Sequence, residues 1–404
     1  MFNTVFNSFV ISIIMFTATA FAEDVPQVTV EEIISGALER SPLAKEIEAR
    51  AVARKAEGLS IGTLENPELD AELKAPVAYS NDRGDNQIDV SLSQRLRPSD
   101  FGIRDRINGL VAEAGNHDRA IDLVELTQSL RLLYMKAWAS QEQLRQVRSG
   151  REQAKKLSQL IKAGALQALY GPADSALVEA EEKKLLAEQI GLESDLNRTK
   201  AEIIRKSGAA LQAGTLAKPS FSPIDTSSLL EVNLPVFQRA QALVRLSTEQ
   251  QKLARLDSYP RFAPRLVYSR NEEGTSYVGA GISFDLPFFN TNQAEKLRTA
   301  AEVSAARSLA DYLAGPRFQE ELRLLSTSLD ASRKQAQIYE QEVIPALKKS
   351  FEAYEAAFKR GQGSAFQLFQ MLGDLTAAKT RGLELWVKIQ SERSELSVLV
   401  GKDI

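Results

Sequence analysis

Two segments between residues 67 and 97 alternate apolar and polar side chains with the two-residue period of a β-strand. The turn residues Asn81-Asp82-Arg83-Gly84-Asp85 separate them, which predicts a hairpin. The apolar positions are Leu69, Ala71, Leu73, Ala75, Val77 and Tyr79, followed by Ile88, Val90, Leu92 and Leu96. The charged positions of the opposite face include Glu68, Asp70, Glu72, Lys74 and Asp89. Each strand therefore has one oily face and one charged face.

A second alternating pair occupies residues 261–287 around the turn Asn271-Glu272-Glu273-Gly274. Its apolar positions are Phe262, Pro264, Leu266 and Tyr268, then Val278, Ala280, Ile282, Phe284 and Leu286. Strands of about 10 to 12 residues suit a tilted bilayer crossing and are long for a soluble hairpin. Aromatic residues near the strand ends suggest the girdle of a membrane barrel; they are Tyr79, Tyr259, Tyr277, Phe288 and Phe289. Four strands leave unpaired edges, which hydrocarbon does not tolerate, so we expect three copies to share one barrel of about twelve strands.

Long helices follow each strand pair. Residues 101–167 contain no proline and predict a helix of about 100 Å at about 1.5 Å per residue. A seven-residue coiled-coil repeat runs along it through Leu123, Leu126, Leu130, Leu133, Ala137, Leu144, Val147, Ala154 and Ile161. The companion helix is expected over 174–211, and the second pair over 290–359 and 364–400. Gly150 and Pro345 are expected to interrupt their helices at similar places.

The chain therefore reads as a duplication, with strands about 67–97 in one half and 261–287 in the other. Pro67 matches Pro260 and Pro98 matches Pro287. A helical stretch opens each half, over 29–62 and over 234–256. The predicted repeats are 23–213 and 236–404, joined by a surface linker over 214–235 that is rich in proline and serine.

The N-terminal residues have the features of an export signal. An apolar stretch from Phe9 to Phe16 precedes Ala20-Phe21-Ala22, a pattern that signal peptidase cuts, so residues 1–22 are expected to be removed. No later segment is long and apolar enough for a transmembrane helix, which leaves a soluble chain or one that spans a membrane by strands. No cysteine follows the signal segment, so no lipid anchor is expected.

The composition excludes several kinds of chemistry. The chain has no cysteine, a single histidine (His117) and a formal net charge of −3, which argues against a resident metal site, a cofactor and a nucleic-acid surface. No P-loop, nucleophile elbow or zinc spacing occurs, so no enzyme is predicted. His117 is expected to be a solvated side chain on a long helix.

The sequence resembles the TolC-type outer-membrane efflux proteins, and within them the metal-efflux branch. The duplication, the strand ending in Gly279-Ala280-Gly281-Ile282-Ser283-Phe284-Asp285-Leu286-Pro287, and the turn around Gly361 are the residues that show this resemblance. The resemblance implies a mostly α fold with a membrane β-barrel: a homotrimer with a twelve-stranded barrel, four strands per protomer, on a long periplasmic α-helical barrel. It also implies a passive outer-membrane conduit that works with a periplasmic adaptor and an inner-membrane transporter of the RND or ABC type, in an efflux or type I secretion-like system.

The resemblance also suggests candidate site residues. A reversal between two helices at the periplasmic tip needs a backbone that can leave the helical conformation, which glycine allows. The tip residues are also expected to dock the adaptor. They are Gly164, Leu166, Gly361 and Gly363. Family members place aspartates at the closed aperture, where this chain has Gln367 and Gln370 beside Arg360. The charged strand residues Glu68, Asp70, Glu72, Lys74 and Asp89 are expected to line the lumen.

A second interpretation remains open at this stage. A periplasmic coiled-coil adaptor or scaffold would use the same long helices and keep its sheet in water. Bilayer-length strands with one oily face favour the channel, because an adaptor does not need them.

Overall fold

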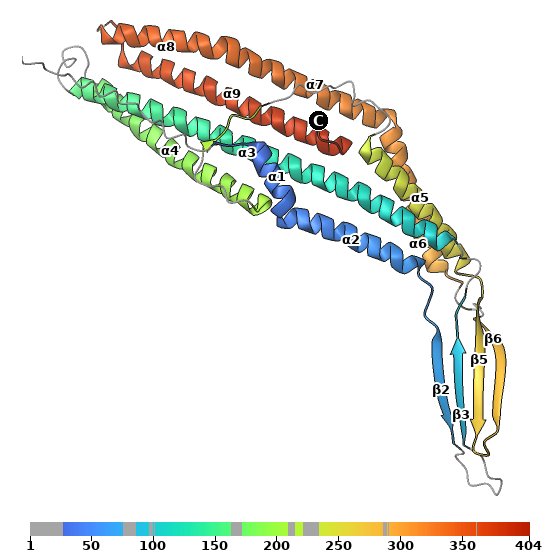
Figure 1. The fold of residues 1–404 in the computed structure, drawn as a ribbon. Coiled ribbons are helices and arrows are strands. Elements are labelled where there is room, and N and C mark those ends of the chain that lie inside the picture. The colour runs from blue at the N-terminus through green and yellow to red at the C-terminus, as the bar shows by residue number, and fades with distance from the viewer. Residues whose placement is uncertain are drawn as a thin grey trace, which may run out of the picture.

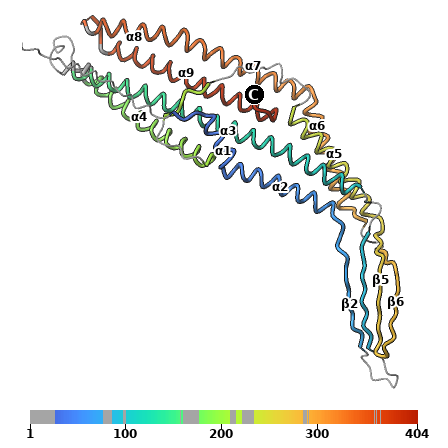
Figure 2. The backbone as a smooth tube through the Cα atoms, in the orientation of Figure 1, coloured from blue at the N-terminus to red at the C-terminus, as the bar shows by residue number. Residues whose placement is uncertain are grey.

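The computed structural model describes residues 27–75, 86–96, 100, 102–162, 172–208, 215–220, 234–285, 289, 291–360 and 362–404. Most of these residues are helical, which confirms the prediction of a mostly α chain. The molecule is elongated, with a long body of helices and one four-stranded sheet at its end (Figure 1, Figure 2). The predicted export segment 1–22 and the predicted tip residues Gly164, Leu166 and Gly361 lie outside the described residues.

The sheet combines strands from both halves of the chain. Its order is β2-β3-β5-β6 and every neighbouring pair is antiparallel. β3 pairs with β5, so the two hairpins form one sheet rather than two separate ones. β2 and β6 are the edge strands. The bounds are Glu68–Lys74 for β2, Gln87–Ser93 for β3, Arg261–Asn271 for β5 and Ser276–Asp285 for β6.

The helices of the first half pack around one long helix, α3. A capping box at Thr29 starts α1, because the Thr29 side chain accepts from the Glu32 amide and the Glu32 carboxylate accepts from the Thr29 amide. Ser41 caps α2, in which Pro42 occupies the first turn. The bounds are Val30–Arg40 for α1, Pro42–Gly62 for α2, Ile103–Lys162 for α3 and Pro172–Ser207 for α4.

The predicted coiled-coil seam lies on the buried side of α3. Leu130, Ala137 and Val147 are nearly inaccessible to solvent, and Leu126, Leu133, Leu144 and Ala154 are buried with them. They pack in clusters with residues of α1, α4 and α9, the last spanning Ala365–Val400. The prediction that Gly150 interrupts this helix is wrong, since α3 is continuous from Ile103 to Lys162. A buried glycine costs helix propensity but leaves the hydrogen-bond ladder intact.

The single helix predicted over 290–359 is wrong in one respect, because it is broken. α6 ends at Ala314, and the extended Gly315 precedes Pro316 at the start of α7. A Cβ on Gly315 would lie 2.9 Å from the Asp311 carbonyl oxygen, so this close approach requires glycine. The second-half bounds are Pro235–Leu256 for α5, Gln293–Ala314 for α6, Pro316–Ile338 for α7 and Ile344–Lys359 for α8.

Pro345 is accommodated by a local change of helix type. The residues Tyr339–Val343 form a π-helical turn, η3, directly before α8. Proline lacks the N–H that an α-helix uses, and the wider π turn shifts the hydrogen-bond pattern just before it. The predicted interruption at Pro345 is therefore present as a π turn between α7 and α8.

The linker predicted over 214–235 contains a strand that sequence analysis did not anticipate. β4 (Thr215–Leu216) pairs in parallel with β1 (Gln27–Val28). The hydroxyl of Tyr134 on α3 lies 2.7 Å from the Val28 carbonyl oxygen and 2.8 Å from that of Ala217, and burial raises its pKa. The Gln141 amide bonds both the N–H and the C=O of Leu216, at 2.9 and 3.1 Å. The linker is thereby held to the middle of α3.

Helix α9 ends at a glycine with left-handed backbone. Gly401 has φ of 71°, and its N–H and that of Lys402 bond carbonyls in the last turn of the helix. A Cβ at this position would lie 3.0 Å from Val236 and 3.1 Å from Ile121. Both the backbone conformation and the close packing therefore favour glycine.

We predict opposite effects of alanine at two glycines. Gly401→Ala should lower the free energy of unfolding by about 1 to 3 kcal/mol, because it strains the left-handed cap. Gly191→Ala, in α4 with nothing within 4 Å of its Cβ, should raise it by about 0.5 to 1 kcal/mol through helix propensity. Denaturant titration followed by circular dichroism in one detergent measures both, and equal shifts at the two positions would contradict the assignment of the cap.

Candidate functional site: a two-faced sheet and a helical tip

The register of the sheet aligns the apolar positions of all four strands. Leu69 pairs with Leu92, Leu92 with Leu266, and Leu266 with Ala280. Directly paired residues of antiparallel strands share a face, so this is one row across the sheet. The next row is Ala71, Val90, Tyr268 and Val278, and partial rows add Pro264 with Ile282 and Phe262 with Phe284.

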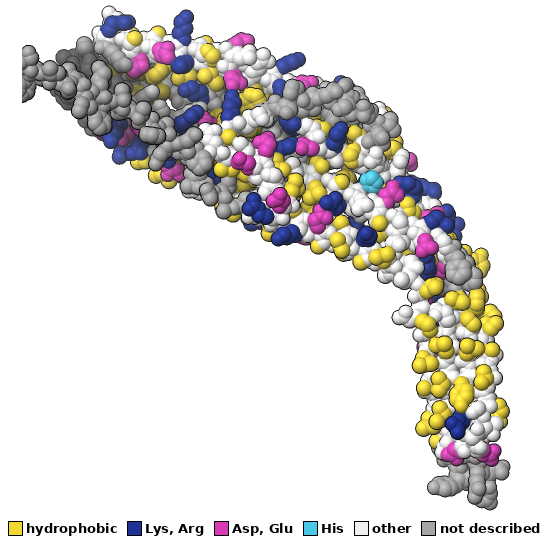
Figure 3. Space-filling view, viewed as in Figure 1, with side chains coloured by type: hydrophobic (Ala, Val, Ile, Leu, Met, Phe, Trp, Pro, Cys, Tyr) yellow, Lys and Arg dark blue, Asp and Glu magenta, His cyan; other side chains and the backbone are white. Residues whose placement is uncertain are grey.

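This apolar face is open to the surroundings in the single chain. Val278 is 83% exposed, Leu69 is 68% exposed and Ile282 is 63% exposed. In Figure 3 hydrophobic side chains gather over the sheet, whereas charged side chains are scattered over the helices. Soluble monomers rarely expose a contiguous apolar surface of this kind, so the face requires a covering partner or a lipid environment.

The opposite face is polar and carries several ion pairs. The five predicted lumen residues Glu68, Asp70, Glu72, Lys74 and Asp89 all lie on it, as their alternation and register require. The Lys74 ammonium lies 2.5 Å from the Asp89 carboxylate and 3.6 Å from Glu72. Asp89 also accepts from the Ser269 hydroxyl and from the Gln87 amide. The network joins acids and a base of β2 and β3 with a hydroxyl of β5.

The register corrects the expectation for Tyr277. It pairs with Ser269, which in turn pairs with Asp89, so Tyr277 lies on the charged face and not on the oily one. Sequence analysis placed it in the girdle because it stands near a strand end. Tyr259 and Phe289 are 61% and 99% exposed at the helical end of the sheet, while Tyr79 and Phe288 lie outside the described residues.

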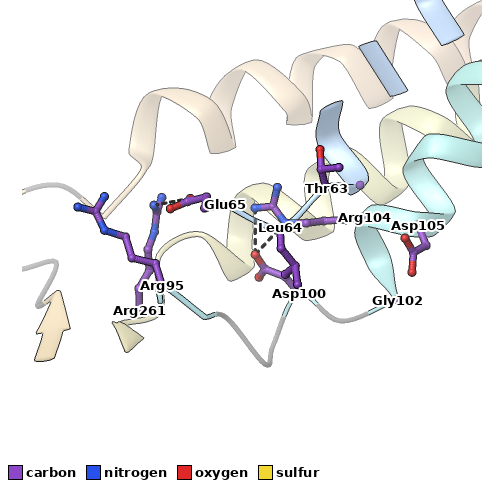
Figure 4. A pocket seen from close by; sticks show the side chains of 10 residues that line it. Thr63, Leu64, Glu65, Arg95, Asp100, Gly102, Arg104, Asp105 and Arg261 are labelled. Carbon is purple, nitrogen blue, oxygen red and sulfur yellow. Dashed lines mark hydrogen bonds and ion pairs between the residues drawn. The ribbon is translucent and has the colours of Figure 1, made fainter. Parts of the chain in front are cut away.

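A cavity of 320 Å³ marks the junction between sheet and helices (Figure 4). Three arginines line it, each with an acidic neighbour. Arg104 lies 3.0 Å from Asp100, and Arg261 lies 3.4 Å from Glu65. Arg95 lies 3.3 Å from Glu68 at the base of the charged face. Arg261 with Glu65 joins β5 to the segment between α2 and β2, and Arg104 also donates to the Ile61 carbonyl at 3.3 Å, which joins α3 to the end of α2.

The second helical turn lies at the end of the body opposite the sheet (Figure 1). Gln362 donates its backbone N–H to the Ala357 carbonyl, and the Arg360 guanidinium lies 3.3 Å from the Gln362 side-chain oxygen. Gly363 follows with its backbone close to Phe358, and Ser364 caps α9 by accepting from the Gln367 amide. Arg360 therefore bonds within its own turn.

Gln367 and Gln370 lie on one exposed face of α9. Their spacing of three residues places them on the same side, whereas Phe369 is buried in a cluster with residues of α3 and α4. Asp374, exposed one turn beyond Gln370, shares this face and was not predicted. The i, i+3, i+7 spacing of Gln367, Gln370 and Asp374 was the signal that could have identified it. Within this pair of helices, burial and then Lys348 lower the pKa of Lys379.

The described residues offer no resident metal site, since no group of three or more His, Asp or Glu side chains is arranged to hold an ion. His117 lies 3.9 Å from Glu113 one helical turn away. Across the same described ranges, every helix is too short or too polar to cross a membrane.

The sequence and the structure were compared with those of known proteins. The chain matches no model of a known protein family. The cobalt-zinc-cadmium resistance protein CzcC of Cupriavidus metallidurans is 23% identical over 240 residues. The alignment covers 59% of this chain and 50% of CzcC, so this chain spans about half the length of that curated relative.

Solved structures match over nearly the whole chain. The outer membrane protein VceC of Vibrio cholerae has a TM-score of 0.73 at 13% identity, covering 92% of this chain and 96% of VceC. The Campylobacter jejuni CmeC outer membrane channel has a TM-score of 0.74 at 14% identity, covering 92% and 85%. The Neisseria gonorrhoeae MtrE outer membrane channel, in its open state, has a TM-score of 0.70 at 16% identity, covering 93% and 89%.

The chain has the TolC-type outer-membrane channel fold. The resemblance stated from the sequence is thereby confirmed. In this TolC-type fold the sheet with its two faces and the helical tip are the two ends of one elongated chain (Figure 2).

Proposed function

We propose that the protein is the outer-membrane channel of a tripartite efflux system and acts as a passive conduit. Three copies join their four-stranded sheets into one barrel of about twelve strands, and their helices continue it as a tunnel in the periplasm. The two halves of the protomer are repeats over 23–213 and 236–404 around a linker over 214–235. Export by a signal over 1–22 would deliver the chain to that membrane.

The observation that supports this proposal best is the open sheet with one exposed apolar face. Among the described residues, no strand pairs with the outer edge of β2 or of β6, which leaves a row of backbone N–H and C=O groups on each. In lipid those groups must be satisfied by another strand, and in water the exposed leucines and valines would favour aggregation. Pairing β6 of one copy with β2 of the next satisfies both edges and places the apolar face against lipid.

The helices support the same arrangement. α2 and α6 lead into and out of the edge strands, and each has exposed apolar residues, among them Val52 at 66% and Leu297 at 73%. In a closed ring of three copies, the α6 edge of one protomer meets the α2 edge of the next. The charged sheet face then lines a wet lumen through Glu68, Asp70, Glu72, Lys74 and Asp89.

The tip is proposed as gate and docking surface. Arg360, Gln367 and Gln370 would approach the threefold axis at the periplasmic end, and Gly164, Leu166, Gly361 and Gly363 would face a periplasmic adaptor. An inner-membrane transporter of the RND or ABC type would supply the energy. The likeness to a cobalt-zinc-cadmium resistance protein supports the metal-efflux branch, with the metal as cargo.

A periplasmic adaptor or scaffold is the second candidate, because the long coiled-coil helices fit it equally well. It gives no reason for the apolar sheet face. Extraction without detergent would favour it over the channel.

The first test of the channel concerns the two faces of the sheet. Leu266→Lys, in the central apolar row, should lower the free energy of unfolding in lipid vesicles by about 2 to 4 kcal/mol, because it places a charge near the bilayer midplane. Asp70→Lys on the charged face is the matched control and should have little effect. Equal losses at the two positions would mean that the apolar face does not meet lipid.

The second test concerns the shared barrel. Because the chain has no native cysteine, only the introduced cysteines can form disulfides. Cysteine at Ala71 in β2 is combined in turn with cysteine at Val278, Ala280 or Ile282 in β6. Within one copy these strands are three apart, about 14 Å, which is too far for a disulfide. We expect one combination to give a covalent trimer after oxidation, while Val90→Cys with Ala280→Cys should give none. Monomer in every combination would contradict the shared barrel.

The third test concerns the gate. Gln367→Ala with Gln370→Ala should raise single-channel conductance in planar bilayers, because it removes amides that can hydrogen-bond across the axis. The pair Glu181→Ala and Glu182→Ala on α4 should leave conductance unchanged. An unchanged conductance in the glutamine variant would remove this face of α9 from the gate.

A further inference from the structure

Most helices of the body either end or are followed by the next helix at about the same distance from the sheet. α1 gives way to α2 at Ser41, and α4 ends at Ser207 beside it. α6 gives way to α7 at Gly315. α9 ends at Val400 where α5 begins after Leu234.

Contacts show that these interruptions lie side by side. The Ser41 hydroxyl donates to the Lys206 carbonyl, which joins the α1–α2 break to the end of α4. A single apolar cluster contains Leu234, Phe318 and Val400, which joins the start of α5, the start of α7 and the end of α9. We call this level the belt.

Helix α3 alone passes the belt without a break among the described helices (Figure 1, Figure 2). Its residues at this level are 121–131. Ile121 packs against the position of Gly401, and Leu126 lines a cleft together with Leu43 and Lys206. The belt therefore divides the protomer into a sheet half and a tip half that share one continuous rod.

Polar contacts, called clamps here, hold chain segments together at the belt. The Tyr312 hydroxyl at the end of α6 donates to the Glu321 carboxylate on α7, over the break at Gly315, and the Tyr312 ring meets that of Phe318 edge to face at 5.8 Å. Asp403, just beyond α9, accepts from the Gln128 amide at 2.8 Å and pairs with Arg131, both on α3.

We propose that the belt is a hinge, at which the tip half tilts against the sheet half by bending of α3 while the interrupted helix pairs open and close beside it. A long helix bends at low cost, whereas its own hydrogen-bond ladder resists stretching. The interrupted helix pairs, such as α1 with α2 and α6 with α7, have no continuous helical hydrogen bonding across the belt, so the distance between the two helices of a pair can change there. The apolar clusters are not directional and tolerate a small rotation, and the clamps at Tyr312 and Asp403 set the resting angle.

The test measures distances across and beside the belt in the full-length protein. Spin labels on cysteines at Arg307 in α6 and Lys334 in α7 span the belt, about 40 Å apart at about 1.5 Å per residue. Labels at Lys155 in α3 and Arg198 in α4 both lie in the tip half and serve as the control pair. Labelled chains are diluted with unlabelled ones, so that distances between copies do not contribute.

We expect the distance distribution of the belt-spanning pair to be at least twice as wide as that of the control pair. Tyr312→Phe, which removes only the hydroxyl, and Asp403→Asn should each widen or shift the belt-spanning distribution and leave the control pair unchanged. A belt-spanning distribution as narrow as the control, insensitive to both variants, would overturn the hinge. A change in both pairs would show general loosening of the tip half and would equally overturn it.

Discussion

A four-stranded sheet with unsatisfied edges and one apolar face is the constraint on which the rest of this protomer depends. Nothing within the described chain covers that face or pairs with β2 and β6 on their outer sides. Backbone groups left unpaired in hydrocarbon cost several kcal/mol each, on the order of the whole stability of a domain when summed over a strand. A single chain therefore leaves two strand edges and one apolar face uncovered, and the proposed assembly would cover all three.

The helices next to the sheet are arranged in the same order as the strands that they adjoin. α2 leads into β2 and α3 leaves β3, while α5 leads into β5 and α6 leaves β6, so the helices stand in the same sequence as the strands. Polar contacts support the junction between sheet and helices: Arg261 of β5 pairs with Glu65, which follows α2, and Arg104 of α3 donates to the Ile61 carbonyl at the end of α2. A ring closed at the sheet would consequently close at the helices as well, which is how one set of edges could define both a barrel and a tunnel.

Local periodicity predicted the parts of this fold whose signal lies within a few residues. The alternation around Leu69 and Leu266 gave the strands and their faces, and the seven-residue spacing around Leu130 gave the buried side of α3. The same reasoning missed β4, which forms by pairing with β1, far away in the chain. Two other misses had local signals: Gly315-Pro316 marks the end of a helix, and Tyr277 is out of phase with the apolar positions Val278 and Ala280.

The site residues on the sheet could be predicted from the sequence more fully than those at the helical tip. The charged strand residues follow from alternation alone, because every second residue of a strand shares a face. At the tip, the positions of Gln367 and Gln370 on an exposed face follow from helical spacing, but their approach to an axis depends on other copies. Arg360 bonds to Gln362 within its own turn, a local contact that resemblance to a family does not reveal.

The charges of the sheet face bear on how a conduit of this type could select its cargo. Lys74 lies beside Asp89 and Glu72, and Arg95 lies beside Glu68, so bases stand among the acids of that face and reduce its negative field. A mixed, paired surface attracts neither cations nor anions strongly, since the fields of close opposite charges cancel within a few ångströms and salt screens the remainder. On the proposed assembly the lumen would be wet and permissive. Discrimination between cargoes would then rest with the pump and adaptor that load the tunnel, and the outer-membrane protomer would contribute only passage and the timing of its opening.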